Sequence, residues 1–229
     1  MTHGFVARFL SWTLLAALAT GGSALAQPQS GPPLSARWDV SLEMPMWPAL
    51  QDLQPNAGGT FDALGFGIGG SWHVPVSRYA NSDMLVGVDG WIAATDSNIP
   101  GRIGDVLARH LYLGLSAKWL FGDSRNVSLD AGIGYHELDI AQVDTEWYGT
   151  LEYEHWSSSR GGAFVGATWD LGAGRPDHSS GLSLGFRVHF VDFGSAHDRG
   201  SLFTPAVLGP DAGALDGPLY TLRIAYSGR

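Results

Sequence analysis

The sequence contains no cysteine, a single lysine and few charged residues for its length. Without cysteine, the 229-residue chain cannot form disulfides, thiolate metal sites or cysteine nucleophiles. Lysine and arginine total 13 against 22 aspartates and glutamates, which gives a formal net charge of −9. Because nucleic-acid binding needs clustered basic side chains, we expect no nucleic-acid partner. Charged residues make up 15% of the chain, where a soluble domain carries about 25%, so little charge faces water.

Long hydrophobic runs are also lacking, because no stretch of 18 apolar residues follows residue 30. At the N-terminus, Arg8 precedes a short apolar core that ends near an Ala24-Leu25-Ala26 site, which is typical of a cleavable secretory signal peptide. We therefore expect a signal peptide over 1–26, a flexible lead-in over 27–35 and one folded domain over 36–226. An exported chain without a spanning helix is either soluble or inserted as a β-barrel.

Eight segments alternate apolar and polar residues with a period of two, which predicts β-strands. They cover residues 36–44, 62–74, 83–95, 109–121, 126–137, 161–171, 181–192 and 217–226. Most are longer than the about 5–6 residues of a soluble strand and match the about 9–11 residues that cross a membrane at a tilt. The sequence therefore predicts an all-β fold, an eight-stranded antiparallel up-and-down transmembrane β-barrel.

The connections between these segments alternate in length, at 17, 8, 13, 4, 23, 9 and 24 residues. Outer-membrane barrels have short periplasmic turns and long outer loops, so both termini are expected in the periplasm. An extracellular ligand would then contact loops 45–61, 138–160 and 193–216. Loop 138–160 mixes acidic and aromatic residues, which suits protein or glycan contact, although these residues could equally extend the neighbouring strands above the membrane.

Aromatic residues mark the strand ends that this order brings to the periplasmic side. Interfacial Trp and Tyr form girdles at membrane boundaries, so we expect an outward-facing girdle there. The outward faces of the strands are predicted to carry no charge. The predicted girdle consists of Trp38, Trp72, Trp119, Trp169 and Tyr226.

The inward faces carry most of the charge in the predicted strands. An eight-stranded barrel is just wide enough for side chains to fill it, and buried charges must be paired. We therefore expect Lys118, Arg187 and Arg223 to pair with lumen acids as a structural plug, with a gated ion path as the alternative. Inward histidines lie on different strands, and neither a metal site nor a cofactor is predicted. The predicted lumen network comprises Asp39, Glu43, Asp89, Lys118, Asp130, Asp170, Arg187 and Arg223, and the histidines are His73, His110, His136 and His189.

One short motif has the residue types of a hydrolase. His155 and Ser157 would share one face of a strand, and Glu152 could orient the histidine, as a serine nucleophile requires. The His-x-Ser pair resembles that of outer-membrane lipid A deacylases, which are also eight-stranded barrels. The charged, loop-edge setting favours a solvated loop, so we predict a non-enzyme and keep the lipid A-modifying hydrolase as an alternative.

Two stretches near the C-terminus carry a family resemblance. Phe186–Gly194 reads Phe-Arg-Val-His-Phe-Val-Asp-Phe-Gly, and Gly217–Tyr226 is a glycine followed by alternating apolar and aromatic residues. Both resemble the small outer-membrane β-barrel family, which includes the outer-membrane protein A transmembrane domain and opacity/porin-like surface proteins.

The resemblance implies a monomer in the bacterial outer membrane, with barrel-assembly machinery, outer-membrane lipids and lipopolysaccharide as partners. Its implied role is structural or in surface interaction, with weak pore activity left open. A soluble periplasmic β-sandwich binding protein is the remaining alternative.

Overall fold

The computed structural model describes residues 35–51, 60–61, 64–79, 82–98, 105–121, 125–146, 149–171, 180–194 and 215–228. The predicted signal peptide 1–26 lies outside the described residues, as does the lead-in 27–35 apart from Ser35. Within the described ranges, no helix is both long and apolar enough to cross a membrane.

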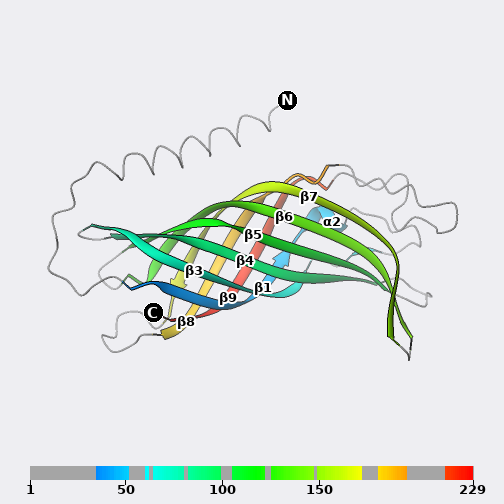
Figure 1. The fold of residues 1–229 in the computed structure, drawn as a ribbon, viewed down its shortest axis with the longest axis horizontal. Helices are drawn as coiled ribbons and strands as arrows, with labels where there is room; N and C mark the ends of the chain where they lie inside the picture. Colours follow the sequence, from blue (N-terminus) through cyan, green and yellow to red (C-terminus); the bar gives the residue numbers. More distant parts are fainter. Residues whose placement is uncertain are drawn as a thin grey trace.

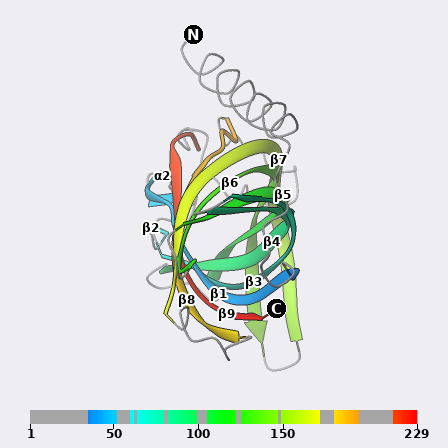
Figure 2. The ribbon, with the colours of Figure 1, turned by 90° about the vertical axis from the view of Figure 1, so that its left-hand side faces the viewer.

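Eight long antiparallel strands close into a β-barrel. Neighbouring strands follow the order β4, β3, β1, β9, β8, β7, β6 and β5, and β5 pairs with β4 to complete the ring (Figures 1 and 2). A two-residue strand, β2 (Thr60–Phe61), pairs with the end of β4, and a short helix, α2 (Pro48–Gln51), follows β1. The barrel strands are β1 (Arg37–Met46), β3 (Phe66–Tyr79), β4 (Ser82–Asn98), β5 (Asp105–Phe121), β6 (Val127–Glu146), β7 (Gly149–Asp170), β8 (Ser180–Phe190) and β9 (Pro218–Gly228).

Each predicted segment overlaps one barrel strand, so the predicted fold class is confirmed. Because side chains alternate across a strand, the period-two pattern places apolar residues outside and polar residues inside. Ile68 and Leu113 are 63% and 62% exposed on the outer wall, whereas Asp89 and Arg187 are 2% and 1% exposed in the lumen. A soluble sandwich would bury its apolar face against a second sheet, so closure into one ring excludes the sandwich alternative.

The two ends of the barrel differ. We call the end where β1 begins the base and the end that carries α2 the top. At the top, β6 and β7 continue beyond the apolar wall and form the outer hairpin, residues 137–146 and 149–160, which β5 accompanies as far as Val143 of β6 (Figure 1). The neighbouring strand β8 pairs with β7 only between Ala163 and Asp170.

The prediction of long loops at the top is wrong for the β6–β7 connection. Residues 138–160, predicted as a loop, are almost entirely strand, and only 147–148 lie between β6 and β7. The sequence left open whether this segment is a binding loop or an extension of the neighbouring strands, and in the structure it extends the strands. The local sequence did not decide this, because acidic and aromatic residues occur in both exposed strands and loops.

The prediction of an uncharged outer wall is wrong at its upper edge. Arg109 and Asp139 are cross-strand partners that form an ion pair, and the Tyr135 hydroxyl donates to Glu137 Oε2 at 3.1 Å. These charges lie at the start of the outer hairpin. Below them, the outward positions of β6 between Val127 and Tyr135 are all apolar, as predicted.

Candidate functional site

The base half of the lumen contains a continuous network of buried ion pairs, which we call the base network. Its centre is Arg187 on β8, whose two terminal nitrogens each lie 2.8 Å from an oxygen of Asp89 on β4. Asp130 Oδ2 lies 3.6 Å from Arg187 Nη2. The guanidinium also stacks over the Phe164 ring, 4.5 Å from its centroid. A bidentate pair of this kind fixes both side chains across the barrel.

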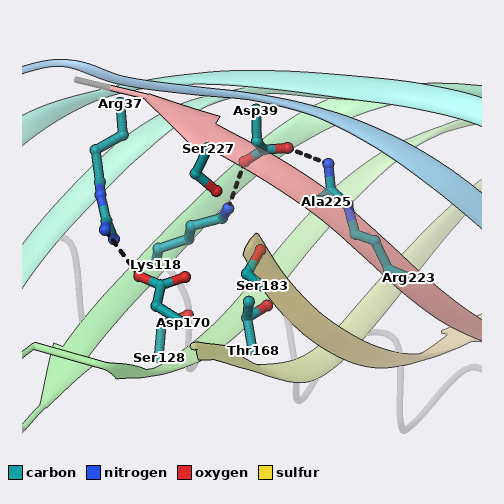
Figure 3. A pocket seen from close by; sticks show the side chains of 10 residues that line it. All are labelled: Arg37, Asp39, Lys118, Ser128, Thr168, Asp170, Ser183, Arg223, Ala225 and Ser227. Atoms are coloured by element: carbon teal, nitrogen blue, oxygen red, sulfur yellow. Dashed lines mark hydrogen bonds and ion pairs between the residues drawn. The ribbon is translucent and has the colours of Figure 1, made fainter. Parts of the chain in front are cut away.

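Arg223 on β9 links the Asp89–Arg187 pair to the carboxylates of β1. Its guanidinium binds Asp39, lies 3.0 Å from Glu43 Oε1 and lies 3.5 Å from Asp89 Oδ2. Lys118 Nζ on β5 reaches the other Asp39 oxygen at 3.1 Å, as Figure 3 shows. The three cations predicted for the lumen therefore all have carboxylate partners, which buried charges require.

The base network ends at the mouth of the barrel in a smaller ion pair. Arg37 Nη2 lies 2.7 Å from Asp170 Oδ2, and both side chains are partly exposed (Figure 3). The pocket beside them has a volume of about 10 Å³, which is room for one water molecule. All eight residues predicted for the lumen network thus lie inside the barrel, with Asp170 paired to Arg37 rather than to the three central cations.

The top half of the lumen is aromatic, which the sequence analysis did not predict. We call this group the top cluster: Trp47, Trp91, His110, Tyr112, His136, Phe164 and His189. Its rings contact one another in many pairs, such as Trp91–His110 with centroids 4.6 Å apart and Tyr112–His136 at 4.7 Å. The sequence signal for this aromatic half of the lumen was the inward position of Phe164, between inward Gly162 and Gly166.

A cap closes the top cluster from outside. Leu50 on α2 and Leu215 are buried against the cluster, together with Val191 and Phe193 from the chain after β8. Phe193 N donates to Leu215 O at 3.1 Å, and Leu215 N donates to Gly194 O at 2.9 Å. Gly194 has a φ of +76°, a left-handed conformation that favours glycine. The family-like stretch Phe186–Gly194 therefore supplies Arg187 to the base network, His189 to the top cluster and Phe193 to the cap.

Four of the five residues of the predicted girdle lie within three residues of the base ends of their strands, whereas Trp72 lies in the middle of β3. Trp38 pairs with Trp72 across β1 and β3, and its ring centroid lies 6.1 Å from that of Tyr226 on β9. Trp119 and Trp169 occupy the corresponding ends of β5 and β7. All except partly buried Trp119 are exposed by 40% or more, and each belongs to the outward face of its strand.

The hydrolase candidates lie on the outer hairpin. Ser157 is exposed on β7 opposite Asp139 of β6. His155 and Glu152 belong to the same strand, but their side chains lie outside the described residues. Across the described part of the chain, no group of three ligand side chains is placed to hold a metal ion.

Because side chains fill the lumen, we expect the barrel not to conduct ions. The purified protein is expected to give no steady ion conductance in planar bilayers, because the base network and the top cluster block the path in series. Lys118→Ala should also be silent, since it removes one base side chain and leaves the top cluster closed. A known conducting porin in the same bilayers is the control, and steady wild-type conductance that scales with salt would instead support the gated ion path.

Comparison with known proteins finds similar solved structures at low sequence identity. The chain matches no protein-family model and no curated protein. One similar structure is Ail, the attachment invasion locus protein of Yersinia pestis, in complex with the heparin analogue sucrose octasulfate, at 12% identity and a TM-score of 0.42. The alignment covers 84% of this chain and 96% of Ail.

Two further similar structures carry surface or outer-membrane names. Neisserial surface protein A is 11% identical with a TM-score of 0.39, over 84% of this chain and 96% of that protein. The outer membrane protein OprG from Pseudomonas aeruginosa is 11% identical with a TM-score of 0.42, over 86% and 97%.

Proposed function

We propose that this protein is an outer-membrane barrel whose role is surface interaction through the outer hairpin. The observation that carries the proposal is the combination of an apolar outer wall, a filled lumen and a hairpin that rises above both. A closed lumen leaves transport without a path, whereas a rigid barrel is a suitable support for a projecting binding element.

The apolar wall has the height that a bilayer requires. On β6, the apolar outward positions run from Val127 to Tyr135, which matches the about 9–11 residues of a tilted membrane-spanning strand. The exposed aromatic residues Trp38, Trp72, Trp169 and Tyr226 border this wall at the base, and Arg109 with Glu137 borders it at the top. The proposal thus places the predicted girdle at the periplasmic interface.

The outer hairpin has the length to reach a partner outside the membrane. From Glu137 to Glu146, β6 extends about 30 Å beyond the apolar wall at the usual rise per residue. Its partner β7 is paired with β6 along this whole length, which makes the hairpin a stiff ribbon rather than a loose loop. The acidic and aromatic residues of its sequence suit contact with a protein or a glycan.

Surface labelling in intact cells tests both location and orientation. Because the sequence has no cysteine, Thr145→Cys at the hairpin and Ser124→Cys in the β5–β6 connection each create a single thiol. A membrane-impermeant maleimide is expected to label Thr145→Cys in intact cells and Ser124→Cys only after the outer membrane is permeabilised. The protein should also fractionate with outer membranes and change gel mobility on heating. Recovery in the soluble periplasm, or labelling of Ser124→Cys alone in intact cells, would contradict the proposal.

A further inference from the structure

Three histidines meet in the top half of the lumen. His110 on β5, His136 on β6 and His189 on β8 are 5%, 0% and 0% exposed. The His136 ring centroid lies 5.3 Å from those of both His110 and His189, and His110 Nε2 lies 3.1 Å from His136 Nδ1. Strand pairing therefore gathers at one height three side chains that are far apart in the sequence.

Most of the imidazole nitrogens in this group have no hydrogen-bond partner among the described residues. These atoms are His110 Nδ1, His136 Nε2 and both nitrogens of His189. Buried polar atoms without partners are costly and call for an explanation in function or in bound water. Each neutral imidazole carries one nitrogen that accepts a proton, so the group contains three proton acceptors in an apolar setting.

The strands around the histidines supply few charges. Trp91 on β4, Phe164 on β7 and Leu219 on β9 are the uncharged neighbours at this height. Tyr112 on β5 contacts His136 and His189 through its ring. The charged groups that face the lumen from these elements lie in the base network: Arg187 on β8 is paired with Asp89 on β4, Arg223 on β9 with Asp39 and Glu43 on β1, and Lys118 on β5 and Asp130 on β6 join the same network. Arg109 on β5 and Asp139 on β6 pair with each other on the outer face, Glu137 on β6 binds the outward Tyr135, and Arg160 on β7 and Asp192 after β8 are exposed.

A small cavity lies between the cap and this group. Its volume of about 10 Å³ is room for one water molecule, and His110 lines it. Trp47, Leu50 and Leu138 also line it. Trp47 joins β1 to α2, and its ring contacts both His110 and Phe193 of the cap. A displacement of His110 would therefore reach both α2 and residues 191–194.

We propose that the top of this barrel is an acid-sensitive seal, in which protonation of His110, His136 and His189 releases the cap formed by α2, residues 191–194 and Leu215. The first proton places a positive charge among aromatic and aliphatic side chains, with the carboxylate of Asp89 already held by Arg187. Further protons repel the first at ring separations of 5.3 Å. Water must then enter to solvate the charges, and the apolar cap separates from the cluster.

The barrel wall and the base network are not part of this switch. The wall is held by backbone pairing between all eight strands, and the Arg187–Asp89 pair lies below Phe164. Acid is therefore expected to loosen the cap while the barrel stays folded. His73 gives a matched control, because it is also fully buried but sits in the base half, where its two nitrogens lie 3.1 Å from Ser71 Oγ and 2.8 Å from Ser116 Oγ.

A spin label on the cap tests the proposal, because the signal of the label does not itself depend on pH. Ala49→Cys on α2 provides the single thiol, since the sequence has no other cysteine and Ala49 packs against the top cluster. The labelled protein is refolded in phosphatidylcholine vesicles and studied by electron paramagnetic resonance at about pH 7.5 and about pH 4.5, either side of the ordinary histidine range. The mobile fraction of the label is expected to rise several-fold in acid and to fall again at neutral pH.

Variants separate the seal from a general acid effect. His110→Gln, His136→Gln and His189→Gln combined should keep the label immobile at both pH values, and His73→Gln should respond like the parent. If the triple variant loses heat-dependent gel mobility, His189→Gln alone should at least halve the acid response. An acid response that survives in the triple variant, or no response in the parent, would overturn the proposal.

Discussion

Arg187→Ala is expected to destabilise the barrel by about 3–5 kcal/mol, because it leaves the carboxylate of Asp89 buried without its main partner. Arg187 and Asp89 are each almost fully buried, so water cannot replace the lost bonds without entering the lumen. The change is measured as the free energy of unfolding in urea for protein refolded into lipid vesicles, with gel mobility reporting the folded fraction.

The Arg37–Asp170 pair supplies the control for this prediction. Its single nitrogen–oxygen contact is as short, at 2.7 Å, but both side chains are partly exposed at the base. Ion pairs in contact with water contribute about 0–1 kcal/mol, so Arg37→Ala should have little effect. Combining Arg187→Met with Asp89→Leu should recover much of the stability, because no buried charge is then left alone at that point. Equal losses for Arg37→Ala and Arg187→Ala would show that burial does not govern these pairs.

Gly87→Val is expected to destabilise the barrel by about 3 kcal/mol or more and to lower the yield of folded protein. Gly87 faces the lumen on β4, and a Cβ there would collide with the Trp72 carbonyl and the His73 Cα of β3. Because these are backbone atoms, a side chain can fit only if the β3–β4 pairing shifts. The fraction of heat-modifiable protein after refolding measures this effect.

Gly161 gives the matched control on the outer face. It lies on β7 opposite Tyr135, and a Cβ built there meets nothing within 4 Å. Gly161→Val should therefore change the free energy of unfolding by no more than about 0.5 kcal/mol. If both valine variants fold equally well, close backbone approach is not what requires glycine at Gly87.

The predicted strands and their faces agree well with the structure, and the agreement has a simple local cause. Whether a residue such as Arg187 or Leu184 points inward or outward depends only on its place in the pleat, so the period-two pattern reveals it. The same logic identified Asp39, Asp89 and Lys118 as lumen residues and placed Trp38 and Trp72 on the outer face. It failed at Arg109 and Glu137, because a pleat sets the face of a residue but not its height.

Height is a property of register, and register depends on which residues of separate strands are hydrogen-bonded. The sequence alone determined the barrel class, the eight strands and the polarity of each face, since these follow from alternation within single strands. Only the tertiary structure decided that Arg187 pairs with Asp89, that β6 and β7 continue as a hairpin, and that His110, His136 and His189 meet. Each of these depends on contacts between residues tens of positions apart, which no local pattern in one chain specifies.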